Sequence, residues 1–285
     1  MTLPVVEFAT RPNAIPPPGI DGAVASEWLE AFLRDELVVR RGIERAVVGL
    51  SGGVDSAVTA YLCARALGAR NVHAIRMPYK TSSPSSLSDA QLVVEALGIN
   101  ERTIEITDAV DGYLQFEPDA DARRRGNVMA RVRMVVLFDQ SAKLGALPVG
   151  TGNKTERLLG YFTWHADDTP PINPLGDLFK TQVWALARYL GVPQALIDKA
   201  PSADLEADQT DEADLGISYA RADAILSQML IGYSDEQLAA HGFLPADVAL
   251  VRSRVDSTHW KRHLPTTAML SNTAINEFYL RPVDY

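Results

Sequence analysis

The 285-residue chain is predicted to be an α/β protein: a doubly wound parallel sheet with helices on both faces, followed by a helical C-terminal part. Between residues 46 and 150, apolar runs of strand length alternate with helical patterns, which is typical of a parallel sheet. A glycine turn joins the first run to the helical pattern that follows it. Strand, tight loop and helix direct backbone N–H groups and a positive helix end at an anion. Ligands of such sheets bind beyond the strand ends, so this loop is expected to border a binding site.

Composition excludes several classes of protein. The net charge of −9 argues against a general nucleic-acid binder. Cys63 is the only cysteine, so disulfides, cysteine metal clusters and a redox pair are excluded and a reducing compartment is indicated. We expect Cys63 to be a core residue rather than a nucleophile. The sequence shows neither a signal peptide nor an apolar run of membrane-spanning length, so a cytoplasmic location is predicted.

The chain is expected to divide into an arm and one domain. Residues 1–20 contain a proline run that blocks helix and sheet pairing, which predicts an extended N-terminal arm. Residues 21–285 show no internal repeat and are predicted to form a single domain. Its first helix is predicted from Asp21 to Leu37, because apolar side chains recur there at helical spacing.

The elements up to residue 106 are predicted from local pattern. The loop helix ends at Gly68, and residues 71–77 are predicted as the second strand. A serine-rich loop comes next, with Ser88 expected to cap a helix over residues 89–97. The β-rich run at 102–106 is predicted as the third strand.

Residues 117–125 carry closely spaced opposite charges and are expected to form a solvated loop, with Arg123 to Arg125 as a phosphate site the weaker alternative. A long helix is predicted over 126–144, then a short strand at 146–150 that runs into a second glycine turn facing the same site. Later helices are predicted over residues 180–190 and 218–230.

The loop after the first strand reads Ser-Gly-Gly-Val-Asp-Ser. Gly52 and Gly53 allow main chain to approach phosphate oxygens, where a Cβ would intrude. The lysine of a Walker A loop is missing. Asp55 would repel a phosphate unless both bind the same metal ion. The alternative, a simple turn of small residues, fits two glycines better than it fits the whole hexamer.

Glu156 and Lys180 complete the candidate chemistry. Glu156 comes after the second glycine turn, so with Asp55 it forms a plausible Mg²⁺ site whose remaining ligands are phosphate and water. Lys180 begins a helix, where a cation opposes the helix dipole and is better explained by a bound phosphate. Taken singly, a surface glutamate and a solvated lysine remain the alternatives.

These motifs resemble those of ammonia-dependent NAD⁺ synthetases, in the superfamily with an ATP-pyrophosphatase loop and an adenine nucleotide alpha hydrolase-like fold. The resemblance runs in register over most of residues 25–265. The matching blocks are GLSGGVDS at 49–56, MPY at 77–79, residues 126–134, GTGNK at 150–154 with Glu156, residues 160–162, PLGD at 174–177, KTQ at 180–182, PSADL at 201–205 and residues 211–219.

The resemblance implies a role for each matching residue. Asp55, Glu156 and Lys180 would be catalytic, with Asp55 and Glu156 binding Mg²⁺. Arg131, Trp164 and Lys261 would contact the substrate deamido-NAD⁺. The nicotinate carboxylate would attack ATP to give an acyl-adenylate and pyrophosphate, and ammonia would then form the amide and release AMP. A homodimer is also implied. The implied ATP-binding residues are Gly49, Leu50, Ser51, Gly52, Gly53, Val54, Asp55, Ser56, Thr151, Lys180 and Ser202.

Three positions depart from the family pattern on the nicotinate side. Trp164 stands where lysine is usual, Pro171 where aspartate is usual, and Trp260-Lys261 where a His-Lys pair is usual. Each tryptophan would either stack on the ring of the acid or be a buried packing residue. Two other functions stay open at this point: a pyrophosphate-cleaving ligase for another acid, and a non-catalytic nucleotide sensor.

The nitrogen donor has its own signal. Glutamine-dependent relatives carry a glutaminase domain with a catalytic cysteine, and this chain has no suitable one. The resemblance therefore implies free ammonia or ammonia from a separate subunit. Residues 82–88 and 202–214 are expected to be loops that become ordered over ligand.

Overall fold

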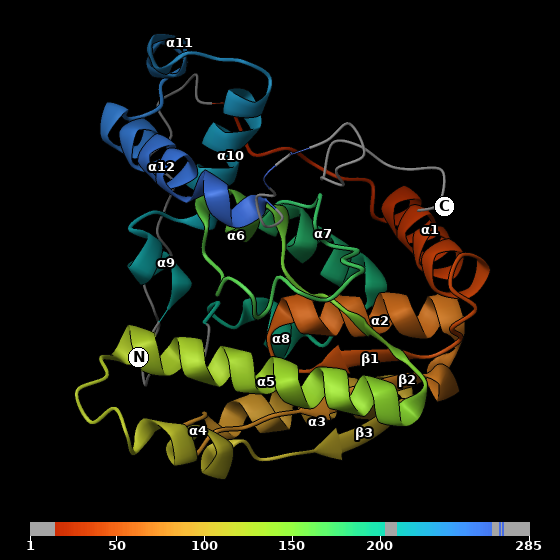
Figure 1. Cartoon of the computed structure of the whole chain (residues 1–285). Helices are drawn as coiled ribbons and strands as arrows, with labels where there is room; N and C mark the ends of the chain where they lie inside the picture. Colours follow the sequence, from red (N-terminus) through yellow and green to blue (C-terminus); the bar gives the residue numbers. More distant parts are fainter. Residues whose placement is uncertain (1–14, 203–209, 264–267, 269, 271–285) are drawn as a thin grey trace.

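Four parallel strands form one sheet in the computed structural model, which describes residues 15–202, 210–263, 268 and 270 (Figure 1). The strands are β1 (Ala46–Gly49), β2 (Val72–Arg76), β3 (Asn100–Thr103) and β4 (Leu147–Val149). Their order is β3-β2-β1-β4, and every neighbouring pair is parallel. The order reverses between β1 and β4, so the loops that leave these two strands start at the switch point where such sheets bind ligands.

Both faces of the sheet are covered by helices, as predicted. On one face, α1, α2, α3, α7 and α8 share a core with Ala46 and Val48 of β1. On the other face, α4 and α5 share a core with Val47. This alternation explains why β1 is a continuous apolar run. The helices are α1 (Gly22–Arg34), α2 (Val54–Leu67), α3 (Pro84–Leu97), α4 (Thr107–Leu114), α5 (Ala122–Leu144), α7 (Lys180–Leu190) and α8 (Gln194–Asp198).

The C-terminal part is helical, as predicted, and has its own apolar cluster. Helices α6, α10, α11 and α12 pack around Tyr219, Ile225, Leu238 and Val251. No helix in the described residues is both long and apolar enough to cross a membrane. The remaining elements are α6 (Lys154–Leu159), α9 (Asp211–Leu215), α10 (Tyr219–Leu230), α11 (Asp235–Ala240), α12 (Pro245–Thr258), a π-helix η1 (Asp35–Val39) and 3₁₀ turns η2 (Ala69–Asn71) and η3 (His259–Arg262).

Several predicted boundaries were wrong. The serine-rich loop is largely helix: α3 begins at Pro84 with Ser83 as its N-cap, because proline at the first helical position is already set for helix. Helix α5 begins at Ala122 rather than 126, since Asp121 accepts from the Arg124 N–H and caps it. The third strand, β3, overlaps the predicted run at residues 102–103, but it begins at Asn100 and ends at Thr103.

Two predictions about domain organisation stay untested. Most of the proposed N-terminal arm, residues 1–14, lies outside the described residues, and residues 15–21 have no regular secondary structure. That residues 21–285 are one domain remains a prediction.

Candidate active site

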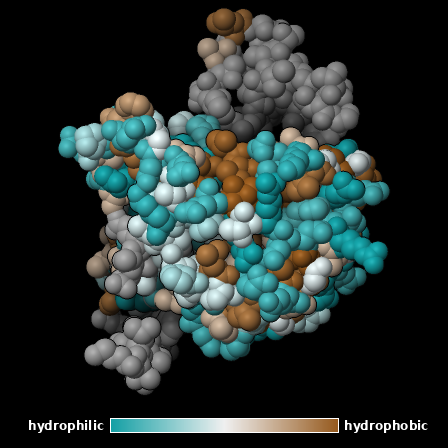
Figure 2. Space-filling view, turned by 90° about the horizontal axis from the view of Figure 1, so that it is seen from below, coloured by the Kyte–Doolittle hydropathy of each residue, from teal (hydrophilic) through white to brown (hydrophobic). Residues whose placement is uncertain are grey.

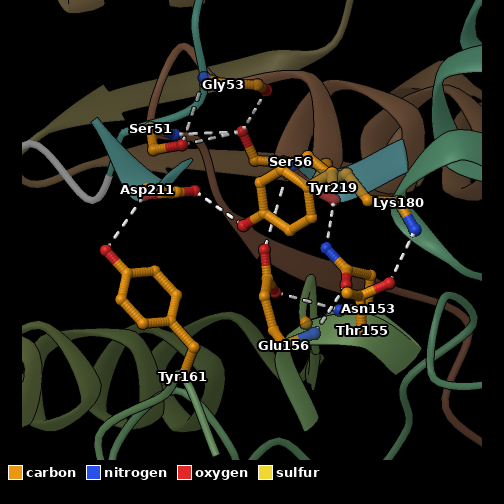
Figure 3. Close-up of polar contacts among 12 residues, drawn as sticks. Ser51, Gly53, Ser56, Asn153, Thr155, Glu156, Tyr161, Lys180, Asp211 and Tyr219 are labelled. Atoms are coloured by element: carbon orange, nitrogen blue, oxygen red, sulfur yellow. Dashed lines mark hydrogen bonds and ion pairs between the residues drawn. The ribbon is translucent and has the colours of Figure 1, made fainter. Parts of the chain in front are cut away.

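The glycine loop is closed by its own hydroxyl groups. The Ser56 hydroxyl donates to the Gly53 carbonyl at 3.0 Å and lies 3.1 Å from the Ser51 hydroxyl. The Gly53 N–H in turn donates to the Ser51 hydroxyl at 3.2 Å (Figure 3). Gly53 is the N-cap of α2, so the loop delivers the positive end of that helix to the switch point.

The structure gives a reason for glycine at position 52 that the sequence did not reveal. Its φ is +80°, a region that side chains disfavour. A Cβ on Gly52 would also lie 2.2 Å from the backbone carbonyl oxygen of Ser86, in the first turn of α3. Glycine is therefore required here by backbone conformation and by the packing of α3, before any ligand is considered.

Asp55, Glu156 and Lys180 come together, as the sequence motifs and the resemblance predicted. The Lys180 ammonium forms an ion pair with one Asp55 carboxylate oxygen and lies 3.7 Å from Glu156 Oε1. Only 2% of the Lys180 side chain is exposed, so this is a buried cation between two anions. Lys180 is the first residue of α7, a position at which the helix dipole disfavours a cation.

Asn153 connects the two carboxylates and was not singled out from sequence. Its side-chain N–H donates to Asp55 Oδ1 at 3.0 Å. It also forms a capping box with Glu156: the Asn153 Oδ1 accepts from the Glu156 N–H at 3.0 Å, and Glu156 Oε2 accepts from the Asn153 N–H at 3.1 Å (Figure 3). The capping box could have been predicted from the sequence, because an asparagine stands three residues before a glutamate.

The electrostatics of the triad are set by burial and proximity. Burial alone would lower the pKa of Lys180, but the charges of Asp55 and Glu156 outweigh it and raise that pKa. Burial, reinforced by the Asp55 charge, raises the pKa of Glu156 to about 8 despite the opposing effect of Lys180. Lys180 therefore stays charged, and a positive ligand bound beside Glu156 would favour the ionised form of its carboxyl group.

The donor set fits Mg²⁺ only with help from a ligand. The described residues contain no group of three or more His, Cys, Asp or Glu side chains arranged to hold a metal ion. Asp55 and Glu156 supply two carboxylates that pair with one cation. Mg²⁺ commonly uses one or two carboxylates and completes its shell with phosphate and water, so the pair fits that ion together with ATP.

A second hydrogen-bonded group borders the triad and also escaped sequence analysis. The buried Asp211 carboxylate accepts from the hydroxyls of Tyr219 at 2.9 Å and Tyr161 at 3.2 Å (Figure 3). The Tyr219 ring lies 5.2 Å from the Lys180 ammonium. Burial raises the pKa of Asp211. Tyr161 is 50 residues from Asp211, so no local pattern could have paired them.

The proposed substrate residues gather around the 160–164 segment. Arg131 of α5 donates to the Trp164 carbonyl at 3.0 Å. Lys261 donates to the Gly160 carbonyl at 2.6 Å, and burial lowers its pKa. The rings of Trp164 and Trp260 meet edge to face with centroids 5.2 Å apart.

Trp260 is 51% exposed, so it is not the buried packing residue that was the alternative for it. Arg131 also lines a cavity of about 180 Å³ beside α4. Arg131 therefore lies between this cavity, which Arg124 and Tyr113 also line, and the segment that carries Trp164.

The remaining predicted site residues occupy compatible places. Thr151 lies just after β4, at the same sheet edge as the glycine loop. Ser202 is exposed and immediately precedes residues that the structure does not describe. The alternative phosphate site at Arg123 to Arg125 stays a prediction; Arg124 pairs with Glu117, and Arg125 donates to the Ala120 carbonyl.

Comparisons with known proteins place the chain in one family by sequence and by fold. Residues 25–265 match the family model for NAD synthase. An NH(3)-dependent NAD(+) synthetase of Trichlorobacter lovleyi is 48% identical over 90% of this chain and 94% of that protein. Among solved structures, an NMN synthetase from Francisella tularensis is 32% identical over 87% of this chain and 99% of its own, with a TM-score of 0.77. An NH3-dependent NAD synthetase from Campylobacter jejuni is 32% identical over 88% and 100%, with a TM-score of 0.75.

Proposed function

Because this chain belongs to the NAD synthase family, we propose that it makes NAD⁺ from deamido-NAD⁺, ATP and ammonia by way of an acyl-adenylate. It is a ligase that forms a carbon–nitrogen bond. One observation carries the proposed course: a buried lysine paired with two carboxylates stands beside the glycine loop at the switch point of the sheet. This arrangement suits the departure of pyrophosphate from ATP better than it suits nucleotide storage.

The proposed first step is an attack by an oxygen of the nicotinate carboxylate on the α-phosphorus of ATP. A carbon–O–phosphorus linkage forms, the bond from the α-phosphorus to the bridging oxygen breaks, and pyrophosphate leaves. Lys180 and the N-terminal end of α2 would stabilise charge on the leaving group, while residues 49–56, Thr151 and Ser202 hold ATP. Mg²⁺, held by Asp55, Glu156 and phosphate oxygens, would supply further charge neutralisation.

The second step needs little from the protein. Ammonia adds to the acyl carbon, the bond to the AMP oxygen breaks, and the amide, AMP and one proton leave. No residue has to form a covalent intermediate, which agrees with a site built from charges and hydrogen-bond donors. The only cysteine, Cys63, is buried in the core, so glutamine hydrolysis by this chain is not expected. Ammonia would come from solution or from a separate subunit.

The acid is proposed to lie against Arg131, Trp164 and Lys261. Both cations are committed to carbonyls of the 160–164 segment, so they fix that segment and add positive potential near it. Trp164 and Trp260 would replace a charged contact to nicotinate by ring stacking. The likeness to an NMN synthetase makes the mononucleotide acid the second substrate to compare.

We also propose that the enzyme is a cytoplasmic homodimer. A lone reduced cysteine agrees with the location. Exposed apolar side chains on α1 and α5, among them Trp28 and Val135, support a protein interface. Hydrophobic residues also occur in small groups on the face seen in Figure 2. Light scattering at working concentration tests the dimer, and a monomer there would exclude it.

Isotope transfer tests the reaction course directly. Deamido-NAD⁺ carrying ¹⁸O in its carboxylate is incubated with ATP, MgCl₂ and ammonium. The acyl-adenylate route predicts one ¹⁸O in AMP and none in pyrophosphate, whereas ADP and labelled inorganic phosphate would point to an acyl phosphate and exclude it. Replacing deamido-NAD⁺ by nicotinate mononucleotide, and ammonium by glutamine, measures the preference for each acid and donor. Absence of AMP, ADP and pyrophosphate with every acid would favour the sensor.

A further inference from the structure

Asp223 of α10 is a fully buried carboxylate that the proposed reaction does not use. Its Oδ1 accepts from the Thr155 hydroxyl at 2.5 Å, and its Oδ2 accepts from the Thr181 N–H at 2.9 Å. Thr155 precedes Glu156, and Thr181 comes after Lys180. The carboxylate therefore lies behind the two residues that form the ion-paired centre of the site.

The need for Asp223 comes from the way α7 begins. Phe179 is the N-cap of α7 and has no side-chain acceptor for the N–H groups of the first turn. The Thr155 hydroxyl accepts from the Lys180 N–H at 3.0 Å and donates its own hydrogen to Asp223 (Figure 3 shows the first of these contacts). Asp223 accepts the next N–H, that of Thr181, directly.

These contacts form one relay between two helix starts. It runs from the Lys180 N–H to the Thr155 hydroxyl, then to Asp223, which also holds the Thr181 N–H. Thr155 lies in the first turn of α6, next to Glu156 in the capping box. Fixing both helix starts sets where the Lys180 ammonium stands relative to the Glu156 and Asp55 carboxylates.

We propose that Asp223 is a positioning residue for the reaction: it holds Lys180 in register with Asp55 and Glu156 through Thr155. The proposal rests on the proposed function, because it assigns Lys180 a role in pyrophosphate departure. A carboxylate suits the position better than an amide, since two donors must be accepted at once and an amide has only one oxygen. The positive end of α7 also favours an anion there.

The experiment uses the full chain and two independent ways of breaking the relay. Asp223→Asn removes one acceptor, and Thr155→Val removes the hydroxyl at nearly constant shape. Thr155→Ser restores the hydroxyl, and Ser227→Ala is the matched control on α10, because Ser227 donates within that helix to the Ala224 carbonyl. Each variant is made alone and in a Lys180→Met background, and pyrophosphate release is measured.

The expected result is a loss of kcat that depends on the presence of Lys180. Asp223→Asn and Thr155→Val lower kcat about 10- to 100-fold with the KM for ATP nearly unchanged, since a displacement of about 1 Å can cost that much. Thr155→Ser retains most of the rate and Ser227→Ala all of it. In the Lys180→Met background the same two changes lower the remaining rate less than about 3-fold, because coupled residues are not additive. Equal losses in both backgrounds would overturn the proposal.

A second readout separates this proposal from the proposed function. Lys180 is labelled with an amine-acylating reagent, and the labelled peptide is quantified by mass spectrometry without any substrate. A mispositioned ammonium is expected to label faster in Asp223→Asn and Thr155→Val than in the wild type, Thr155→Ser or Ser227→Ala. Unchanged labelling in both relay variants overturns the positioning role, even if the wild type turns over; faster labelling supports it, even if the acid substrate proves to be different.

Discussion

Asp55, in the first turn of α2, and Lys180, at the start of α7, form a partly buried ion pair across 125 residues of sequence. Each charge alone is electrostatically unfavourable in its local setting: Asp55 is an anion in a predicted phosphate-binding loop, and Lys180 is a cation at the positive end of a helix. Together they account for each other, because the pair balances both charges inside the site. A phosphate group or a metal ion that enters the site must therefore compete with an existing contact.

Lys180→Met is expected to lower kcat/KM for pyrophosphate release by about 100-fold or more, the usual effect of removing one donor to a developing anion. Asp55 and Glu156 would lose their shared cation, so the free energy of unfolding should also fall, by about 3 kcal/mol. Initial-rate assays and urea unfolding measure the two effects. Lys154→Met is the matched control, since Lys154 pairs with Asp177, whose side chain is 95% exposed. Equal effects of both changes would contradict the role of Lys180.

Gly52→Ala is expected to disrupt the loop before any ligand binds. Alanine at φ +80° costs about 1–2 kcal/mol, and its Cβ must also displace the Ser86 carbonyl. We expect the thermal midpoint to fall by about 2–8 °C or more. Gly53→Ala is the comparison, because a Cβ there meets only the Ser51 hydroxyl, at 3.3 Å. Equal thermal midpoints for Gly52→Ala and Gly53→Ala would show that α3 moves away from the added Cβ at little cost, so that glycine is not required at position 52.

Features that depend on local pattern could be predicted from the sequence. The parallel sheet around the glycine loop and the start of α7 at Lys180 were predicted from periodicity and turn chemistry. The grouping of Asp55 with Glu156 and Lys180 was predicted from the two glycine turns and the unfavourable cation at a helix start, and the family resemblance supported it. The start of α3 was missed although Pro84 was a usable signal.

The rest of the site depends on contacts between distant segments. Asp223 meets Thr155 across 68 residues, and Tyr161 meets Asp211 across 50, which no spacing rule connects. The requirement for glycine at 52 likewise comes from a neighbour on α3 rather than from the loop itself. Such partners are set by how separate helices pack against one another, so they appear only in three dimensions.

Trp164→Ala should weaken binding of the acid and spare the nucleotide. Ring stacking is worth about 1 kcal/mol, so the KM for deamido-NAD⁺ is expected to rise about 5- to 10-fold while the KM for ATP stays within about 2-fold. Trp164→Phe keeps a ring and should recover part of the loss. Initial rates with each substrate varied in turn measure this. A rise confined to the KM for ATP would place Trp164 outside the acid site.

Cys63 should behave as a core residue and not as a nucleophile. Burial raises the pKa of its thiol to about 12, so we expect no reaction with iodoacetamide at pH 8 until the chain unfolds. Cys63→Ser should keep its ammonia-dependent kcat; a loss of kcat with the fold intact would contradict this.

The same thiol predicts a difference in pH dependence. The pKa of the Cys63 thiol is higher in the folded chain than in the unfolded chain. The contribution of the protonated thiol to the free energy of unfolding is therefore fully present below pH 9 and is lost as pH rises toward 12. Between pH 8 and 11 the wild type should therefore lose about 2–3 kcal/mol more unfolding free energy than Cys63→Ser, as urea titrations at each pH would measure. Parallel curves for the two proteins would mean that the thiol ionises as readily in the folded chain as in the unfolded one.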